Sequence, residues 1–249
     1  EKATVDTANP ELNIEQYRNR NRYSLATSWS AAKSFVSVLI GIAIEQGLIG
    51  SINESASLHI NEWADDERSA VTIRQLLDMR SGLTPMCFHS DSGTIEVCAG
   101  SGHGGGDLIF SDDQMSACLA RNLAVTGVTQ PWYRSATLPY NPGDFVYSNC
   151  DTMVLGEILW RATGKNLQAY ADIELFSKIG MTAHWWRDNE ATAQVNGNYL
   201  AYCCLDATPR DFAKFGQLLL NNGTWNNEQI IPASYIESIK NIISTSNIN

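Results

Sequence analysis

The sequence predicts an α+β fold in which helices greatly outnumber strands. An almost uninterrupted apolar run follows Lys33. It lasts about three helical turns, which is typical of a buried core helix and too short to cross a bilayer. Apolar residues recur at helical spacing in several later segments, whereas strand signals are sparse. The chain contains neither an internal repeat nor a low-complexity tract.

The first part of the chain is expected to contain one long helix and a short one. Residues 1–27 are polar and irregular, without a convincing strand pattern. The long helix is expected from Ser30 to Ile44, and the glycines that follow can adopt the left-handed conformation of a helix cap. Residues 71–79 predict a short amphipathic helix. The stretch 84–142 is richer in Gly, Ser and Cys, which predicts a long loop around one further helix.

The later helices are expected from the signals at their ends. Ser111 opens a capping-box pattern whose acids would lie at the positive end of the helix dipole, so we assign these acids a structural role. Apolar spacing predicts helices over 151–162 and 167–179, each followed by a glycine. A proline in the first turn opens a helix over 207–219, and Pro232 opens the last one.

Composition excludes several classes of function. The chain has 249 residues, of which 44% are hydrophobic and 18% charged, enough to bury one large core or two smaller ones. The formal net charge of -10 argues against nucleic acid or anionic lipid as a partner. The histidines and cysteines lack the spacing of a zinc site, so no metal and no cofactor are expected. The sequence predicts a small-molecule substrate and no membrane span, and it leaves the oligomeric state open.

The six cysteines have two interpretations. Cys87 and Cys98 flank a loop that contains Gly and Ser, and they could form a disulfide, as in an exported protein. Buried free thiols explain the count nearly as well. The location therefore stays open, with a periplasmic or secreted protein favoured over a cytoplasmic one. The polar start of the chain shows no signal peptide, which is compatible with a processed N-terminus.

Ser30 and Lys33 are the first candidate catalytic residues. A serine and a lysine three positions apart on a helix share one face, so the amine can reach the hydroxyl and accept its proton. The pattern is common, and a helix start with a solvated lysine is the alternative. Because a buried helix follows, we expect Lys33 to be partly desolvated, which lowers an amine pKa toward the range of a general base.

Tyr147 and Asn149 form a second candidate pair, delivered by the turn at 142–143 just before a helix. At this spacing on extended backbone, both side chains point to the same side. A phenol near a lysine loses its proton more easily, and an asparagine amide can hold both a lysine and a substrate carbonyl. The alternative is an ordinary half-buried tyrosine with Asn149 as a helix N-cap.

Ser-x-x-Lys followed by Tyr-x-Asn resembles the penicillin-recognising serine hydrolases, which include class C β-lactamases, DD-peptidases, related esterases and 6-aminohexanoate-dimer hydrolases. Further segments are similar to the family in its order: 29–35, 73–77, 81–83, 142–149, 155–157, 163–165, 180–181 and 203–216. The similarity covers residues 22 to 240. The segments 28–33 and 203–216 are most similar to the 6-aminohexanoate-dimer hydrolase and carboxylesterase branch.

The resemblance implies a β-lactamase and penicillin-binding-protein fold and an acyl-serine mechanism on an ester or amide. By position, Ser30 would be acylated and would also donate its backbone N–H to the oxyanion, and Lys33 would be its proton partner. Tyr147 would pass a proton to the leaving group, and Asn149 would orient Lys33 or the substrate. Trp29 is a candidate substrate contact, one of five aromatic residues that could line an acyl pocket or simply pack: Trp29, Trp132, Tyr133, Trp185 and Trp186.

The sequence departs from the family pattern near its end. The family's third motif, Lys/His-x-Gly, lies on a C-terminal strand, and the chain stops at Asn249 before such a strand. We therefore expect residues 1–249 to form one incomplete unit, with an irregular segment 1–27 and the nucleophile helix and helical domain over 28–249. His103 begins a His-x-Gly out of order, and without a Gly-x-Ser-x-Gly elbow an α/β-hydrolase is not supported. The alternative function is an inactive fragment or a relative that binds ligands without turnover.

Overall fold

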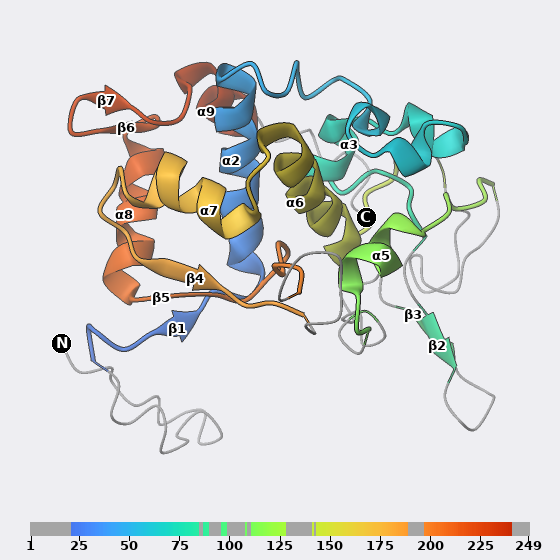
Figure 1. The fold of residues 1–249 in the computed structure, drawn as a ribbon, viewed down its shortest axis with the longest axis horizontal. Helices are drawn as coiled ribbons and strands as arrows, with labels where there is room; N and C mark the ends of the chain where they lie inside the picture. The colour runs from blue at the N-terminus through green and yellow to red at the C-terminus, as the bar shows by residue number, and fades with distance from the viewer. Residues whose placement is uncertain are drawn as a thin grey trace.

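The computed structural model is built around two neighbouring helices, α2 (Ala32–Glu45) and α6 (Asn149–Thr163), which lie side by side near its centre (Figure 1). It describes residues 21–84, 87–89, 96–98, 108, 111–127, 141, 143–188 and 197–240. The other α-helices are α3 (Ile73–Leu77), α5 (Gln114–Leu119), α7 (Leu167–Ala171), α8 (Pro209–Leu220) and α9 (Ala233–Lys240). Short 3-10 helices span Trp29–Ala31, Ala56–Leu58, Asn61–Trp63 and Glu67–Ala70, and a π-helical turn spans Asp172–Phe176.

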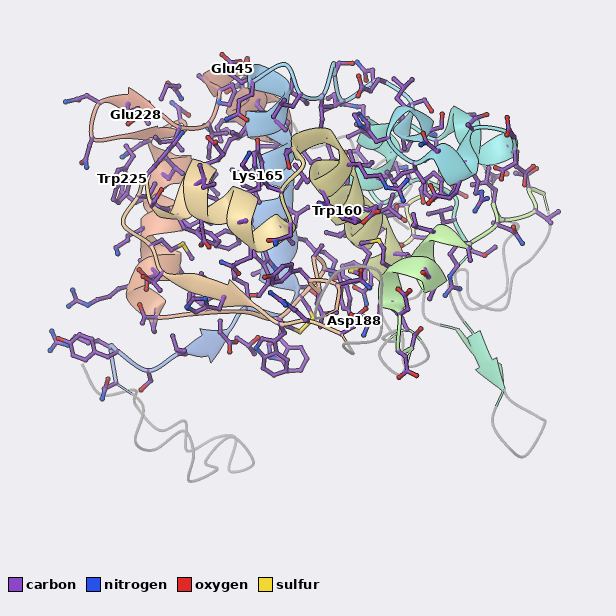
Figure 2. All side chains as sticks on the ribbon, in the orientation of Figure 1. Glu45, Trp160, Lys165, Asp188, Trp225 and Glu228 are labelled. Carbon is purple, nitrogen blue, oxygen red and sulfur yellow. A yellow bond between two sulfur atoms is a disulfide. The ribbon has the colours of Figure 1, made fainter. Side chains whose placement is uncertain are left out.

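Helix α2 is buried along most of its length because its apolar run leaves few polar positions. Phe35 stacks on Phe215 of α8 with ring centroids 3.7 Å apart and meets Phe176 edge to face. On another side, Gly41 leaves room for the ring of Tyr235 from α9. Glu45 marks the end of α2 that is remote from the sheet, so the N-terminal end of the helix faces the sheet (Figure 2).

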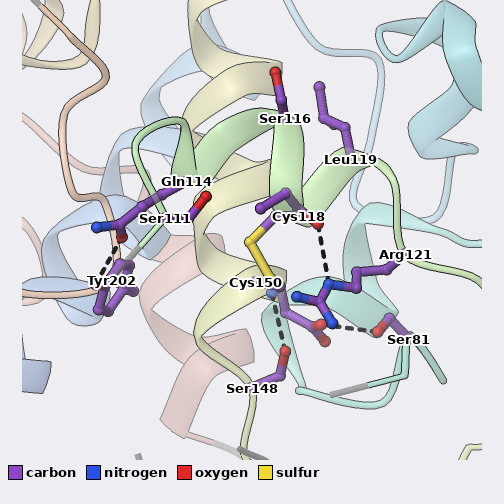
Figure 3. The surroundings of a disulfide bond; sticks show 12 residues. Ser81, Ser111, Gln114, Ser116, Cys118, Leu119, Arg121, Ser148, Cys150 and Tyr202 are labelled. Carbon is purple, nitrogen blue, oxygen red and sulfur yellow. Dashed lines mark hydrogen bonds between the residues drawn. A yellow bond between two sulfur atoms is a disulfide. The ribbon is translucent and has the colours of Figure 1, made fainter. Parts of the chain in front are cut away.

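The other long helix, α6, ends near the predicted position but begins at Asn149, two residues earlier than predicted, so the expectation that Asn149 precedes the helix on extended backbone is wrong. Helices α3 and α5 pack against α6. Helix α6 ends at Gly164 in the left-handed conformation. The expected capping box at Ser111 is wrong: the N-cap of α5 is Asp113, whose carboxylate accepts the N–H of Ser116 at 2.9 Å. A disulfide between Cys118 and Cys150 joins α5 to α6 (Figure 3).

A small antiparallel sheet lies below the N-terminal end of α2, with strands β1 (Ala26–Thr27), β5 (Leu205–Ala207) and β4 (Ala183–Trp185) in the order β1-β5-β4. Ala26 and Ala183 both lie opposite Ala207. The expectation of no strand in 1–27 is therefore wrong at β1. A strand of two residues is too short for an alternating pattern, and its partner β5 supplies the pairing.

Two hairpins complete the described strands: β2 (Cys87–His89) with β3 (Glu96–Cys98), and β6 (Thr224–Trp225) with β7 (Glu228–Gln229). The structure is helix-rich with few strands, which agrees with a partial α+β fold. None of the described helices is both long and apolar enough to cross a bilayer.

Candidate active site

The turn before α2 is tied to β5 by two hydrogen bonds of Ser28. Its N–H donates to the carbonyl of Leu205 at 2.8 Å, and its Oγ accepts the N–H of Leu205 at 3.0 Å. Next, Trp29 has a φ of 46°, a conformation that residues other than glycine rarely adopt. This strained residue directly precedes Ser30, which is exposed at the start of the helix. Such strain is found at functional sites more often than elsewhere.

Lys33 lies one turn after Ser30 and reaches its hydroxyl, with Nζ 3.1 Å from Ser30 Oγ. The same nitrogen donates to Asn149 Oδ1 at 2.9 Å and to the main-chain oxygen of Tyr202 at 2.7 Å. The ring of Tyr147 lies on another side, with its centroid 4.9 Å from Nζ. The structure thus brings Ser30, Lys33, Tyr147 and Asn149 together around one nitrogen.

Burial changes the proton affinity of both titratable members of this cluster. Desolvation lowers the pKa of Lys33, although the phenol of Tyr147 opposes part of the shift. For Tyr147, burial raises the pKa of the phenol. The hydrogen bonds with Ser30 and Lys33 and the charge of Lys33 outweigh burial, so the net pKa of Tyr147 is lowered. The two groups therefore exchange a proton more easily than the same groups in water.

The partners of Lys33 determine which way its lone pair points. An ammonium has three N–H donors, which match the three oxygen acceptors from Ser30, Asn149 and Tyr202. A neutral amine has two donors and one lone pair. The two carbonyl oxygens can only accept, so they take both N–H groups and leave the lone pair for a hydroxyl proton. The hydroxyl of Ser30 lies within reach of that lone pair at 3.1 Å, and Tyr147 also interacts with this nitrogen. The geometry suits a general base that acts on this serine.

Asn149 is placed by the start of α6. Ser148 is the N-cap, because its Oγ accepts the N–H of Asp151 at 3.1 Å. The alternative interpretation of Asn149 as the N-cap is therefore wrong. Because Ser148 caps the helix, the side-chain amide of Asn149 is available to accept a hydrogen bond from Lys33.

Tyr202 is a member of the cluster that the motifs do not indicate. It is buried, and its hydroxyl donates to Gln114 Oε1 at 2.9 Å, which fixes the ring. Burial raises the pKa of its phenol to about 12, so the phenol stays neutral. The carbonyl, not the side chain, holds Lys33, and a main-chain acceptor has no sequence signature.

The candidate aromatic residues have different surroundings. Trp29 is 72% exposed beside Ser30, so its assignment as a substrate contact stays a prediction. Trp185 is buried in the core with its ring stacked on Phe176, so of the two possible roles it has the packing one. Trp186 is exposed and donates its indole N–H to Asp206 at 2.9 Å. The remaining candidates lie outside the described residues, as does the His-x-Gly segment: Trp132, Tyr133 and His103.

The cysteines whose side chains are described form two disulfides, Cys118–Cys150 and Cys203–Cys204. For these four residues the interpretation as buried free thiols is wrong. The β2–β3 ladder places Cys87 opposite Cys98, and their side chains lie outside the described part of the structure. Within the described ranges, no group of three or more His, Cys, Asp or Glu side chains is arranged to hold a metal ion.

Solved structures with the same fold include a Bacillus anthracis protein titled "Putative 6-aminohexanoate-dimer hydrolase", with 26% identity and a TM-score of 0.61 over 90% of this chain and 55% of that one. A class C β-lactamase from Rhodobacter sphaeroides has 16% identity and a TM-score of 0.58, with coverage of 90% and 58%. An octameric penicillin-binding protein homologue from Pyrococcus abyssi has 18% identity and a TM-score of 0.57, with coverage of 90% and 50%.

The chain therefore spans between 50% and 58% of the length of these three structures. Comparison with curated protein sequences gives no match. A family model does match, over residues 12–233, and this range contains the serine, lysine, tyrosine and asparagine of the cluster. The fold and this match agree: the chain belongs to the Beta-lactamase family.

Proposed function

We propose that this chain carries the catalytic serine of a hydrolase that cleaves a small ester or a linear amide through an acyl-Ser30 intermediate. The observation that carries the proposal is the contact of 3.1 Å between Lys33 Nζ and Ser30 Oγ, made by a lysine whose pKa is lowered by burial. Membership of the Beta-lactamase family supports a serine hydrolase in general terms.

The reaction can be written with each proton assigned. Ser30 Oγ attacks the substrate carbonyl carbon while its proton passes to Lys33 Nζ. The scissile bond breaks, and Tyr147 protonates the leaving alcohol or amine and recovers a proton from Lys33. Water then attacks the acyl carbon, loses a proton to Lys33 or Tyr147, and Ser30 Oγ leaves with that proton. The backbone N–H of Ser30 would bind the oxyanion, and one such donor contributes about 3 kcal/mol to the transition state.

Small esters and linear amides are favoured over β-lactams as substrates. The motifs are most similar to the 6-aminohexanoate-dimer hydrolase branch, and the Bacillus anthracis structure with that title shares 26% identity with this chain. Trp29 offers an exposed apolar face next to Ser30, where an acyl chain can pack. The two disulfides suit a protein from an oxidising compartment, such as the periplasm or the cell exterior.

The second candidate function is a relative that binds a ligand without turnover. It rests on the same cluster, because the polar groups of Ser30, Lys33 and Asn149 can hold a ligand by hydrogen bonds without acylation. Such a protein keeps the cluster around Lys33 but forms no covalent intermediate, so covalent labelling separates the two candidates.

The test is intact mass after incubation with a fluorophosphonate and with a p-nitrophenyl ester. Ser30→Ala removes the proposed nucleophile, and Ser34→Ala is a matched control on the same exposed start of α2. We expect one adduct on the wild type and on Ser34→Ala, none on Ser30→Ala, and Ser30-dependent release of p-nitrophenol. A folded wild type without an adduct would favour the binding relative. An adduct that persists in Ser30→Ala would place the nucleophile elsewhere.

A further inference from the structure

A disulfide between adjacent residues, Cys203 and Cys204, directly follows the carbonyl that holds the candidate base. The carbonyl of Tyr202 accepts an N–H of Lys33 at 2.7 Å, and it belongs to the peptide unit that leads into Cys203. The disulfide closes a small covalent ring that contains the next peptide. The orientation of the Tyr202 carbonyl is therefore coupled to the conformation of this ring.

The backbone around the ring is fixed from both sides. Cys204 has a φ of 64°, which residues other than glycine rarely adopt, and its carbonyl accepts the N–H of Trp186 at 2.9 Å. Cys203 is buried and Cys204 half-buried. The next residue, Leu205, donates its N–H at 3.0 Å to the hydroxyl of Ser28, which stands two positions before Ser30. Because the ring restricts the torsions of both cysteines, it favours the unusual conformation over the more extended ones that a reduced chain prefers.

Resting on the function proposed above, we propose that the Cys203–Cys204 disulfide is a positioning element of the active site. It holds the Tyr202 carbonyl against the amine of Lys33 and so keeps the lone pair of that amine directed at Ser30.

Loss of the ring has two separable consequences for Lys33. A carbonyl acceptor stabilises an ammonium more than a neutral amine, so its departure lowers the pKa of Lys33 further. The freed amine can also rotate, so its lone pair is no longer fixed on Ser30 and acylation slows. Among the described residues, the titratable groups packed against Lys33 are the phenols of Tyr147 and Tyr202.

The second disulfide provides a matched control. Cys150 directly follows Asn149, another acceptor for Lys33, and it is bonded to Cys118. Asn149 is the first residue of α6, a helix whose own hydrogen bonds and N-cap Ser148 hold the backbone there. Removal of this second disulfide should lower the stability of the protein but leave the position of Lys33 unchanged.

The experiment compares Cys203→Ser/Cys204→Ser with Cys118→Ser/Cys150→Ser in the full chain. The first readout is the rate of labelling of Ser30 by a fluorophosphonate as a function of pH. In the first variant we expect a maximal rate lower by about ten- to a hundredfold, from a displaced base. We also expect the acidic limb of the profile to move to lower pH by about one unit, from the lost acceptor. In the control variant Cys118→Ser/Cys150→Ser, the acidic limb of the labelling profile should stay at the pH of the wild type.

The second readout is the titration of the Lys33 ammonium by nitrogen-15 NMR, which does not require catalysis. A lower Lys33 pKa in Cys203→Ser/Cys204→Ser alone supports the positioning role, even if the wild type forms no adduct and the hydrolase proposal fails. An unchanged titration with an unchanged rate profile overturns the positioning role. A uniform loss of rate at every pH, with the Lys33 titration unmoved, overturns it too, because that pattern reports only a smaller folded fraction.

A third arm applies if Cys203→Ser/Cys204→Ser fails to fold. All other cysteines are replaced by serine, and the folded protein is treated with a dithiol. The dithiol is oxidised to its own disulfide, and its two electrons and two protons convert the Cys203–Cys204 bond into two thiols. We expect the labelling rate to fall on reduction and to recover on reoxidation. A reduced protein that labels at the original rate overturns the proposal.

Discussion

Replacement of Asp151 by asparagine should stabilise the protein at pH 8 and change its stability little at pH 4. Asp151 lies in the first turn of α6 and is 1% exposed. Its Oδ1 accepts the hydroxyl of Ser81 at 2.8 Å, while its Oδ2 is buried without a hydrogen-bond partner in the described part of the structure. Burial raises the pKa of this carboxyl to about 7, although hydrogen bonds from Ser148 and Ser81 oppose the shift.

The sign and the size of the effect follow from this raised pKa. The ordinary value is 3.8, so the folded state binds the proton more tightly than the unfolded state does. The contribution of protonated Asp151 to the unfolding free energy is therefore fully present below about pH 4 and is lost as the pH rises through about 7. At about 1.4 kcal/mol per unit, the difference amounts to about 4 kcal/mol, an upper value because the surroundings of the carboxylate relax. Asparagine still accepts the hydroxyl of Ser81 and does not ionise.

The assay is urea denaturation of wild type and Asp151→Asn at several pH values between about 4 and 8. We expect the difference in unfolding free energy to grow with pH and then level off. Asp65→Asn, at an exposed position, is the control and should leave the pH dependence of the wild type unchanged. Parallel curves for wild type and Asp151→Asn would show that Asp151 is ionised in the folded protein at low cost, and the reasoning from its burial would be refuted.

Two further predictions concern the core and a buried ion pair. Gly41→Ala should destabilise the protein by about 1 to 3 kcal/mol in thermal or urea unfolding, because its Cβ would lie 2.5 Å from the ring of Tyr235. Gly216→Ala, whose Cβ meets nothing within 4 Å, should be neutral or stabilising, and equal losses in both would contradict this reasoning. Arg161→Met should cost about 3 kcal/mol near pH 8, because it strands Glu157, which is 3% exposed and 2.7 Å from Arg161 Nε. Burial raises the pKa of Glu157, so this cost should shrink at low pH, and a cost that does not vary with pH would refute it.

The parts of this structure that depend on neighbours along the chain could be predicted from the sequence. The contact between Ser30 and Lys33 is an example, because two residues three apart on a helix meet whatever else the chain does. Helix α6 is another, since its apolar spacing and Gly164 are local signals. The approach of Asn149 to Lys33 is not a local contact, because 116 positions separate the two residues. The sequence indicates it only through the resemblance to a family pattern.

The parts that depend on distant segments could not be predicted in the same way. Strand β1 has only two residues and exists because β5 pairs with it, while Leu205 and Ser28 bond across 177 positions. The pairing of Cys118 with Cys150 depends on how α5 packs on α6. Neither cysteine is marked as a partner of the other by spacing, and so a disulfide and a buried thiol look alike in the sequence.

Lys33 shows why a motif is not yet an active site. Ser30 comes from its own turn, Asn149 from the start of α6, and the carbonyl of Tyr202 from a loop 169 positions away. Desolvation is the largest cause of the lowered pKa of Lys33, and desolvation exists only when these segments are packed together. The Ser-x-x-Lys spacing brings the two groups into contact, but the proton affinity of Lys33 is set by the assembled tertiary structure. A variant that loosens the loop at Tyr202 should therefore change the chemistry of Ser30 without altering either motif.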